Sequence, residues 1–521
     1  MRNKSRAIII LLLIPLFTNL TNLHFNKKLN SNPNIILILT DDLGYGDTRC
    51  YNPASKIPTP AIDQLAAEGM LFTDAHAPAA ACTPTRYGIL TGRYAWRGRL
   101  KNWVIYPYDY TLIEQNRPTL ASILQENGYQ TAMIGKWHLG WDWPLKPNMQ
   151  VDTPWTFGSM KAGTKIDLSQ PIGGGAASAG FAYHFGVDVP NYPPYCFIEN
   201  GKILGSIPNK NKPDSVYGNP GLMQEGWELE RILPTLTQKA VDFIEDNRNK
   251  KRSQRWSPFF LFFSLTAPHT PIVPSPAYAG MSQAGDYGDL VVQVDYSVKA
   301  IVEAVKKAGL DKNTLIIFTS DNGSPGYAGD PFLCGKDWHT VNAVTKKFGH
   351  LPNGEWRGIK GDIWEGGHRI PLIARWPGHI APGIKSDALV SLTDLMATFV
   401  KITGASVADE TGEDSFDFSP VLLEKSPGKL PRESMIQHAG DGTFAIRKGE
   451  WKLILGKGSG GLSKVAGIEG PTVKTPGQLY NLSTDPYETI NLYSQHPEIV
   501  RELSALLETH KSLGHSKTQT L

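Results

Sequence analysis

The chain has little cysteine, little net charge and no long apolar run. Its four cysteines, Cys50, Cys82, Cys196 and Cys334, are scattered among 521 residues, which excludes a disulfide framework and a zinc site of clustered thiols. Lysine and arginine total 52 against 49 aspartate and glutamate, so the basic excess typical of a nucleic-acid-binding protein is missing. Hydrophobic residues make up 41%, enough to fill a core. The composition indicates a globular protein of enzyme size.

The amino terminus has the order of an export signal. Arg2, Lys4 and Arg6 precede an apolar run over residues 7–17, as in a secretory signal peptide. The run is shorter than the roughly 20 apolar residues of a membrane-spanning helix, and no cysteine follows it as a lipid attachment site. We therefore expect residues 1–30 to be a signal peptide, the mature protein to be periplasmic or secreted, and no stable membrane anchor.

Short apolar runs alternate with amphipathic segments over most of the chain. Nearly continuous apolar runs at residues 34–40, 259–265 and 314–320 are typical of strands buried on both faces of a parallel sheet. Apolar residues recur at helical spacing over 119–127 and 296–308. This alternation predicts an α/β fold, with a largely parallel central sheet flanked by helices on both faces. Residues 173–180 and 209–219 are expected to be loops.

The pattern changes after Leu423. Proline, glycine and lysine punctuate residues 425–431, and short alternating runs follow at 443–447 and 450–455, with a helical pattern from 497 to 511. We therefore predict a large catalytic α/β domain over residues 31–425. A smaller α+β domain with an antiparallel sheet, over residues 426–521, would complete the substrate pocket.

Polar residues stand directly after the predicted strands. Asp41 and Asp42 follow the first run, and Asp321 and Asn322 follow the run at 314–320. Either pair alone could be a solvated turn or a helix N-cap. Ligands of parallel sheets bind beyond the carboxyl ends of the strands, and oxygen ligands suit Ca²⁺ or Mg²⁺. Together the pairs predict a site for a hard cation, with His269 at the same edge.

Cys82 opens the segment CTPTRYGILTG. Pro84 suits the first turn of a helix, so Cys82 would stand at a helix N-terminus, where backbone amides favour anions. Arg86 adds a positive charge close by. The cysteine could be a reactive thiolate or a small buried apolar residue. The segment therefore predicts an anion site that contains an unusual cysteine.

Several short motifs follow one another in a fixed order. They are Asp41-Asp42, the C-x-P-x-R segment from Cys82 to Arg86 with LTGR at 90–93, GYQTAMIGKWH at 128–138, His269, SDNG at 320–323 and RGIK at 357–360. In this order they resemble the type I, formylglycine-dependent sulfatase family. The resemblance extends from Asn34 to at least Tyr493. Segments 181–202 and 412–415 resemble bacterial carbohydrate sulfatases.

The resemblance implies an alkaline-phosphatase-like core and the conversion of Cys82 to formylglycine by a separate maturation enzyme. Ca²⁺, or less favourably Mg²⁺, would be held by Asp41, Asp42, Asp321, Asn322 and an oxygen at position 82. With three aspartates, one divalent cation and the positive charges of Arg86, Lys136 and Lys360, the pocket would carry a charge of about +2 that suits a sulfate ester.

The resemblance also implies roles for individual side chains. Arg86 and His138 would position the nucleophile, and His138 would take its proton. Lys136 and Lys360 would hold the sulfate, and His269 would protonate the leaving oxygen. Glu365 and Arg369 are expected to brace the Lys360 loop, and His368 to be satisfied locally.

The expected substrate is a sulfated oligosaccharide, either from an algal polysaccharide such as ulvan or carrageenan or from a glycosaminoglycan. Aromatic and hydroxyl-binding side chains suit a sugar ring, and they occur in the loops that would rim the pocket, at Trp141, Asp142, Trp143, His184, Asp188, Asp337, Trp338, His339, His350 and His438. We predict that His184, Asp188 and His350 bind substrate. Two alternatives are a phosphonate or phosphate-ester hydrolase of the same superfamily and an inactive sugar-binding relative.

Overall fold

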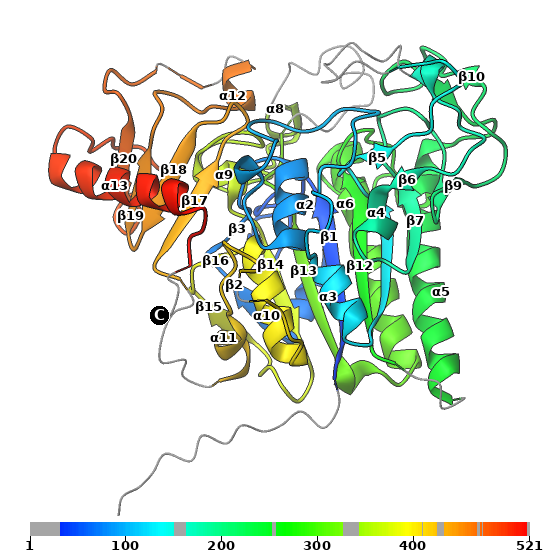
Figure 1. Ribbon diagram of the computed structural model, residues 1–521. Coiled ribbons are helices and arrows are strands. Elements are labelled where there is room, and N and C mark those ends of the chain that lie inside the picture. The colour runs from blue at the N-terminus through cyan, green and yellow to red at the C-terminus, as the bar shows by residue number, and fades with distance from the viewer. Residues whose placement is uncertain are drawn as a thin grey trace, which may run out of the picture.

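A sheet of ten strands organises the larger part of the chain (Figure 1). The computed structural model describes residues 32–150, 163–252, 257–326, 343–408, 410–424, 432–465, 469–470 and 472–517. In order across the sheet the strands are β15 (Ile384–Ser386), β2 (Met70–Phe72), β14 (Leu372–Arg375), β13 (Thr314–Ser320), β1 (Asn34–Asp41), β12 (Phe259–Pro268), β4 (Gln130–Lys136), β7 (Tyr183–Val187), β8 (Ile198–Glu199) and β9 (Lys202–Ile203).

The centre of this sheet is parallel. Strands β13, β1, β12, β4 and β7 pair in parallel with one another. On either side of them, β14 pairs antiparallel with β13 and β2, and β8 pairs antiparallel with β7 and β9. The predicted largely parallel sheet is therefore confirmed. Three of its central strands, β1, β12 and β13, are the apolar runs identified in the sequence, and every residue of each is buried.

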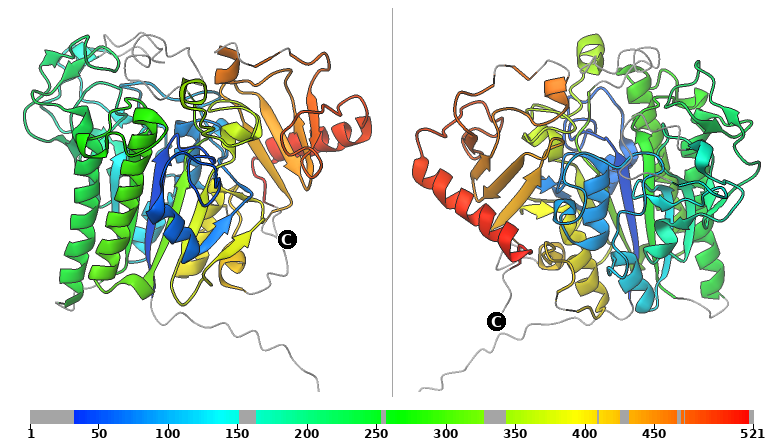
Figure 2. Two further views of the ribbon diagram at one scale, coloured as in Figure 1. Left: turned by 180° about the vertical axis from the view of Figure 1, so that it is seen from behind. Right: turned by 45° about the horizontal axis from the view of Figure 1, so that its top comes forward.

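Helices cover both faces of the sheet, as predicted. Alternate residues of β1 enter two hydrophobic cores, with Ile35, Leu37 and Leu39 in one and Ile36 and Ile38 in the other. The first core lies under α2 (Cys82–Thr91), α3 (Leu120–Glu126) and α10 (Leu395–Thr403), and the second under α1 (Pro60–Ala67), α5 (Ile232–Arg252) and α6 (Gly285–Lys307). Figures 1 and 2 show the two helical layers from opposite sides.

The expected helix at 119–127 is α3, and the one at 296–308 is the second half of the longer helix α6. The two expected loops are partly wrong, since they contain β6 (Gly173–Gly174), α4 (Gly175–Ser178) and β10 (Lys210–Asn211). The remaining short elements are β3 (Ala75–His76), β5 (Trp141–Asp142), β11 (Leu222–Met223), α8 (Ala343–Phe348), α9 (Glu365–His368), β16 (Val390–Ser391), α11 (Ser419–Leu423) and α12 (Leu462–Val465).

A second, antiparallel sheet of four strands follows near the carboxyl terminus, as predicted. Its order is β17 (Ser434–His438), β18 (Phe444–Lys448), β19 (Trp451–Ile454) and β20 (Gln478–Asn481). Helix α13 (Pro497–Leu513) packs on one face through Leu503 and Leu507. The predicted domain boundary falls within residues 425–431, which lie outside the described residues, and so does the predicted signal peptide. No helix among the described residues is long and apolar enough to cross a membrane.

Candidate functional site

The carboxyl ends of four parallel strands bring the predicted polar residues together. Strand β1 ends in Asp41 and is followed by Asp42, β4 ends in Lys136 with His138 two residues on, β12 is followed by His269, and β13 by Asp321 and Asn322. All of these side chains are buried. Because the strands are neighbours in the sheet, the four sequence segments converge on one edge.

Three carboxylates and three cations pair within this edge. Lys136 Nζ donates to both oxygens of Asp41 at 3.0 and 2.8 Å, and Lys360 Nζ lies 2.7 and 2.8 Å from the two oxygens of Asp42. Arg86 donates through Nε and Nη2 to Asp321 Oδ2 at 3.0 and 2.7 Å. These six charges sum to zero, so no buried charge lacks a counter-charge.

The donor set fits a hard divalent cation. Asp41, Cys82 and Asp321 each offer a ligand atom within 4.8 Å of one another. Asn322 Nδ2 donates to Asp42 Oδ1 at 2.7 Å, but the buried Asn322 Oδ1 has no hydrogen-bond partner among the described residues. An unsatisfied buried acceptor beside three carboxylates is unfavourable unless a cation binds it. Oxygen donors of this kind suit Ca²⁺ or Mg²⁺.

Cys82 begins α2 and faces a histidine with a defined tautomer. Its Sγ lies 3.2 Å from His138 Nδ1. His138 Nε2 lies 3.1 Å from the Ile105 carbonyl oxygen, which can only accept, so Nε2 carries the proton and Nδ1 presents a lone pair to position 82. Burial, reinforced by Lys136 and Arg86, holds the His138 pKa well below its usual range. His138 is therefore a neutral base directed at residue 82.

The Cys82 thiol itself is not activated. Burial raises its pKa although Lys136 and Lys360 oppose the shift. Since the thiolate is the nucleophilic form of cysteine, an unmodified Cys82 is protonated at neutral pH. Of the two possibilities that the sequence left open, the buried neutral side chain is the one that the structure favours for the unmodified residue.

His269 lies close to Asp42, one of the three carboxylates at this edge of the sheet. Its Nδ1 lies 2.6 Å from the Thr270 carbonyl oxygen and therefore donates to it, while Nε2 lies 3.8 Å from Asp42 Oδ2. Burial and the charge of Lys360 hold the His269 pKa well below its usual range. The ring is thus neutral in this arrangement, and Nε2 is the atom that would carry a transferred proton.

The three predicted substrate-binding residues have different surroundings. Asp188 accepts a hydrogen bond from Trp141 Nε1 at 3.2 Å and one from the His138 backbone, and burial raises its pKa to about 6. His184 lies within β7 and packs on Trp141, with ring centroids 5.3 Å apart. His350 Nε2 lies 2.8 Å from Asp47 Oδ1. Of the three, Asp188 alone forms a hydrogen bond to the site among the described residues, through the His138 backbone, and the contacts of His350 favour a structural role.

Of the other residues predicted to rim the pocket, the structure describes His438 but not the segment that contains Asp337. His438 is buried beside Phe444, with ring centroids 4.7 Å apart. Asp337, Trp338 and His339 lie outside the described residues, as does Cys334.

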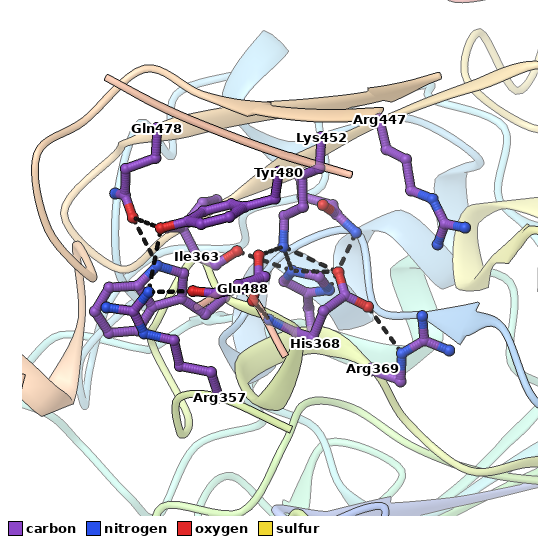
Figure 3. Close-up of polar contacts among 12 residues, drawn as sticks. Arg357, Ile363, His368, Arg369, Arg447, Lys452, Gln478, Tyr480 and Glu488 are labelled. Atoms are coloured by element: carbon purple, nitrogen blue, oxygen red, sulfur yellow. Dashed lines mark hydrogen bonds and ion pairs between the residues drawn. The ribbon is translucent and has the colours of Figure 1, made fainter. Parts of the chain in front are cut away.

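A buried polar network behind the site was not anticipated from the sequence. Lys452 on β19 lies 3.0 Å from Glu365 Oε1 and 2.8 Å from Glu488 Oε1, and all three side chains are fully buried. Its Nζ also lies 3.0 Å from His368 Nε2. Figure 3 shows Lys452, His368 and Glu488 pointing toward one another from different elements. The network thus ties the four-stranded sheet to helix α9.

Helix α9 in turn contacts the segment that follows Asp321 and Asn322. The Gly323 N–H donates to the Gly367 carbonyl at 2.9 Å, and a Cβ at Gly323 would lie 1.9 Å from the Gly366 carbonyl oxygen. Only glycine permits this approach next to Asn322. Arg369 donates to Glu365 at 2.8 Å. This bond joins the two residues to each other, and their expected bracing of the Lys360 loop stays a prediction. The only signal in the sequence was the pair of glycines in the segment EGGHR.

Known proteins are similar to this chain over most of its length. The sequence pattern of the sulfatase family matches residues 33–405. The chain is 35% identical to an N-acetylgalactosamine-6-O-sulfatase of Bacteroides thetaiotaomicron, over 98% of this chain and 100% of that protein, and 32% identical to human arylsulfatase A, over 91% and 87%.

Among solved structures, one from a study of glycosaminoglycan metabolism by Bacteroides thetaiotaomicron has a TM-score of 0.75 and 33% identity, and the match covers 92% of this chain and 100% of that one. The structure of Ps i-CgsB in complex with a neocarrahexaose has a TM-score of 0.66 and 25% identity, with 93% and 94% covered. The expected resemblance is confirmed, and the chain belongs to the sulfatase family.

Proposed function

We propose that this sulfatase removes sulfate from a sulfated carbohydrate, using formylglycine formed from Cys82 and Ca²⁺ bound by Asp41, Asp42, Asp321 and Asn322. The observation that carries the proposal is the orientation of His138. Its lone-pair nitrogen faces residue 82 at 3.2 Å. A base at this position can take the proton of a hydroxyl group that the modified residue 82 would carry.

Formylglycine supplies a hydrated aldehyde that can accept the sulfuryl group through one hydroxyl and expel sulfate through the other. Bound Ca²⁺ supplies Lewis acidity toward the sulfate oxygens. His138 Nδ1 accepts the proton from the group at position 82, and the hydrogen bond from Nε2 to Ile105 keeps the ring oriented. His269 Nε2 carries a lone pair in the neutral ring. His269 therefore acts as the general acid by taking up a proton from solvent at Nε2 when the negative charge of the substrate enters the pocket, and by delivering that proton to the leaving sugar oxygen.

The charge of the pocket supports an anionic substrate. The six side chains that pair at the sheet edge sum to zero, so a divalent cation brings the total to about +2. Lys136 and Lys360 already contact the carboxylates that would bind the cation. Each ammonium group can therefore reach a sulfate oxygen bound to the same cation.

The relatives support a carbohydrate substrate. The bacterial relative acts on N-acetylgalactosamine 6-sulfate by its name, and Ps i-CgsB was solved with a carrageenan-type oligosaccharide. We propose a glycosaminoglycan or algal oligosaccharide as substrate, with Asp188 beside His138 as the contact that recognises a sugar hydroxyl. The basic and apolar order of residues 1–17 supports export, where such polymers occur, and a maturation enzyme as partner.

The test is a screen of matured protein against defined sulfated mono- and oligosaccharides, read by sulfate release. Mass spectrometry of the peptide that contains residue 82 establishes that the cysteine was converted. Cys82→Ala serves as the control, with unchanged circular dichroism and no turnover. A fully converted protein that releases no sulfate from any of these compounds would contradict the proposal.

The same preparation tests the alternatives. Faster hydrolysis of phosphate mono- or diesters than of sulfate esters would favour the phosphoesterase, and tight glycan binding by converted protein without turnover would favour the inactive relative. The match of residues 33–405 to the sulfatase family favours the sulfatase among these.

A further inference from the structure

A second pocket lies where the segment after α2 meets β18 and α13. Its volume is about 420 Å³, and its wall includes Arg93, Trp96, Arg97, Lys101, Phe444 and Lys511. Four of these six residues are cationic, and none of the described residues that line the pocket is acidic. We call it the flanking pocket. Its wall has the composition of a site for an anion.

The two arginines are held in fixed orientations. Arg97 makes two hydrogen bonds of 2.8 Å to the buried carboxylate of Asp414, and its guanidinium carbon lies 4.3 Å from the centre of the Trp96 ring. Arg93 pairs with Glu413 at 3.1 Å and with Glu114 at 3.2 Å. Oriented guanidinium groups recognise anionic oxygens with little further loss of entropy.

The two lysines are more exposed and less constrained. Lys101 Nζ donates to the Trp96 carbonyl at 2.7 Å, and it has no carboxylate in ion-pair distance within the part of the chain that the structure describes. Lys511 Nζ lies 4.2 Å from the centre of the Phe444 ring and 2.8 Å from the exposed Glu508. Such lysines act as mobile point charges at the pocket rim.

The aromatic side chains add a surface for a sugar ring. Trp96 and Phe444 meet edge to face with ring centroids 5.2 Å apart. The indole Nε1 of Trp96 is buried and has no hydrogen-bond partner among the described residues, so it can donate to a ligand oxygen. Aromatic faces next to cations are the features of a site for an anionic sugar.

The flanking pocket adjoins residue 82 along two segments. Lys101 stands two residues, at most about 7 Å, before Trp103, which packs against Ala81 and Cys82. On the other side Phe444 contacts the ring of His438, whose carbonyl accepts a hydrogen bond from the Ala80 N–H at 3.0 Å. The buried Nε2 of His438 has no hydrogen-bond partner among the described residues either. A glycan bound at residue 82 can therefore extend to the pocket.

We infer that the flanking pocket binds a second anionic group, a sulfate ester or a carboxylate, on the same glycan chain whose sulfate is hydrolysed at residue 82. The inference rests on the proposed function for the identity of the chain. It implies that an oligosaccharide with two or more anionic sugars is a better substrate than a monosaccharide with one sulfate.

The kinetic test compares two substrates in matured protein, a chondroitin 6-sulfate tetrasaccharide and N-acetylgalactosamine 6-sulfate. In K101Q/K511Q the ratio of kcat/KM for the tetrasaccharide to that for the monosaccharide should fall about 5–30-fold, as expected for the loss of two exposed charge contacts. K299Q is the matched control, since Lys299 is an exposed lysine of α6 paired with Glu303, and its ratio should equal that of wild type. An unchanged ratio in K101Q/K511Q overturns the inference.

A binding test does not depend on turnover. Calorimetry with Cys82→Ala protein, with and without K101Q/K511Q, measures affinity for the same tetrasaccharide and for its desulfated form, which keeps the carboxylates. Weaker binding of both probes identifies a carboxylate in the pocket, and weaker binding of the sulfated probe alone identifies a sulfate. Equal affinities of the two proteins, or no binding of either probe, overturn the inference. Wild-type protein that is converted but inactive contradicts the proposed function separately.

Discussion

Lys452→Met is expected to be the most informative substitution outside the catalytic edge. The ammonium group of Lys452 is fully buried and neutralises Glu365 and Glu488 at 3.0 and 2.8 Å. Arg369 Nε lies 2.8 Å from Glu365 Oε2 and supplies a second cation to Glu365. Methionine has a similar length, so the substitution removes the charge with little change in volume. One buried carboxylate is then left without a counter-charge.

The expected loss of stability is about 3–5 kcal/mol, the range measured when one partner of a buried ion pair is removed. Activity should fall as well, because Glu365 begins α9, and the Gly367 carbonyl of α9 accepts from Gly323 beside the cation ligands. A displacement of about 1 Å in such a support can lower kcat by about 10²-fold.

The loss should also depend on pH. Burial holds the pKa of Glu488 above its usual range, and Lys452 opposes that shift, so the pKa rises further in the variant. A raised pKa means that the folded protein holds a proton that the unfolded chain releases, and stability falls as the pH rises through the folded pKa. The difference between variant and wild type should therefore be larger at pH 8 than at pH 6.

Urea denaturation followed by tryptophan fluorescence, at both pH values, measures this difference. Lys448→Met is the matched control, because Lys448 lies in the same hairpin but forms an exposed pair with Glu502, and it should change stability by no more than about 0.5 kcal/mol. If the two variants unfold at the same urea concentration, or if the loss is equal at both pH values, the account of Lys452 is refuted.

Three further outcomes are expected. His138→Ala should lower kcat by about 10²–10⁴-fold while the conversion of Cys82, read by mass spectrometry, is unchanged, because the substitution removes a base and not the modified residue. An equal kcat would contradict the role of His138 as the base. Asp321→Asn should lower the calcium content measured by elemental analysis of purified protein, and full retention of calcium would remove Asp321 from the ligand set. Burial raises the pKa of Asp188 to about 6, so this carboxylate should lose its charge below that pH and kcat/KM for sugar sulfates should decline there. Asp188→Asn should abolish this acid-side decline, and an identical pH profile in the variant would exclude Asp188 from substrate binding.

The central strands could be predicted because a parallel interior strand is apolar on both faces. That signal identified β1, β12 and β13, with the last bounded at the same residues as in the structure. It missed β4, whose sequence QTAMIGK contains a glycine and ends in lysine; Lys136 is tolerated there only because Asp41 lies on a nearby strand. The helix predicted from the apolar pattern is also shorter than α6, because Gly285 and Gly288 interrupt that pattern. In the structure these two glycines leave room for the side chains of Phe348 and Ser282.

The residues of the site could be predicted by a related rule, that polar residues placed directly after parallel strands meet at one edge of the sheet. What could not be predicted is how these residues pair. The tautomer of His138 depends on the Ile105 carbonyl, and the partner of Glu365 lies 87 residues away in another sheet. Tertiary packing determines contacts of this kind, and they cannot be predicted from the local spacing of residues in the sequence.

The position of Cys82 has a consequence for the biogenesis of the protein. The residue is 2% exposed and begins a helix whose ten residues are all buried. If Cys82 is converted to formylglycine as proposed, a modifying enzyme must place its own reactive groups against the Cys82 sulfur, which the packed side chains around α2 shield in the folded chain. On that proposal the oxidation takes place before folding, while the segment is still extended, and we expect protein that folds unmodified to be a poor substrate for the modifying enzyme.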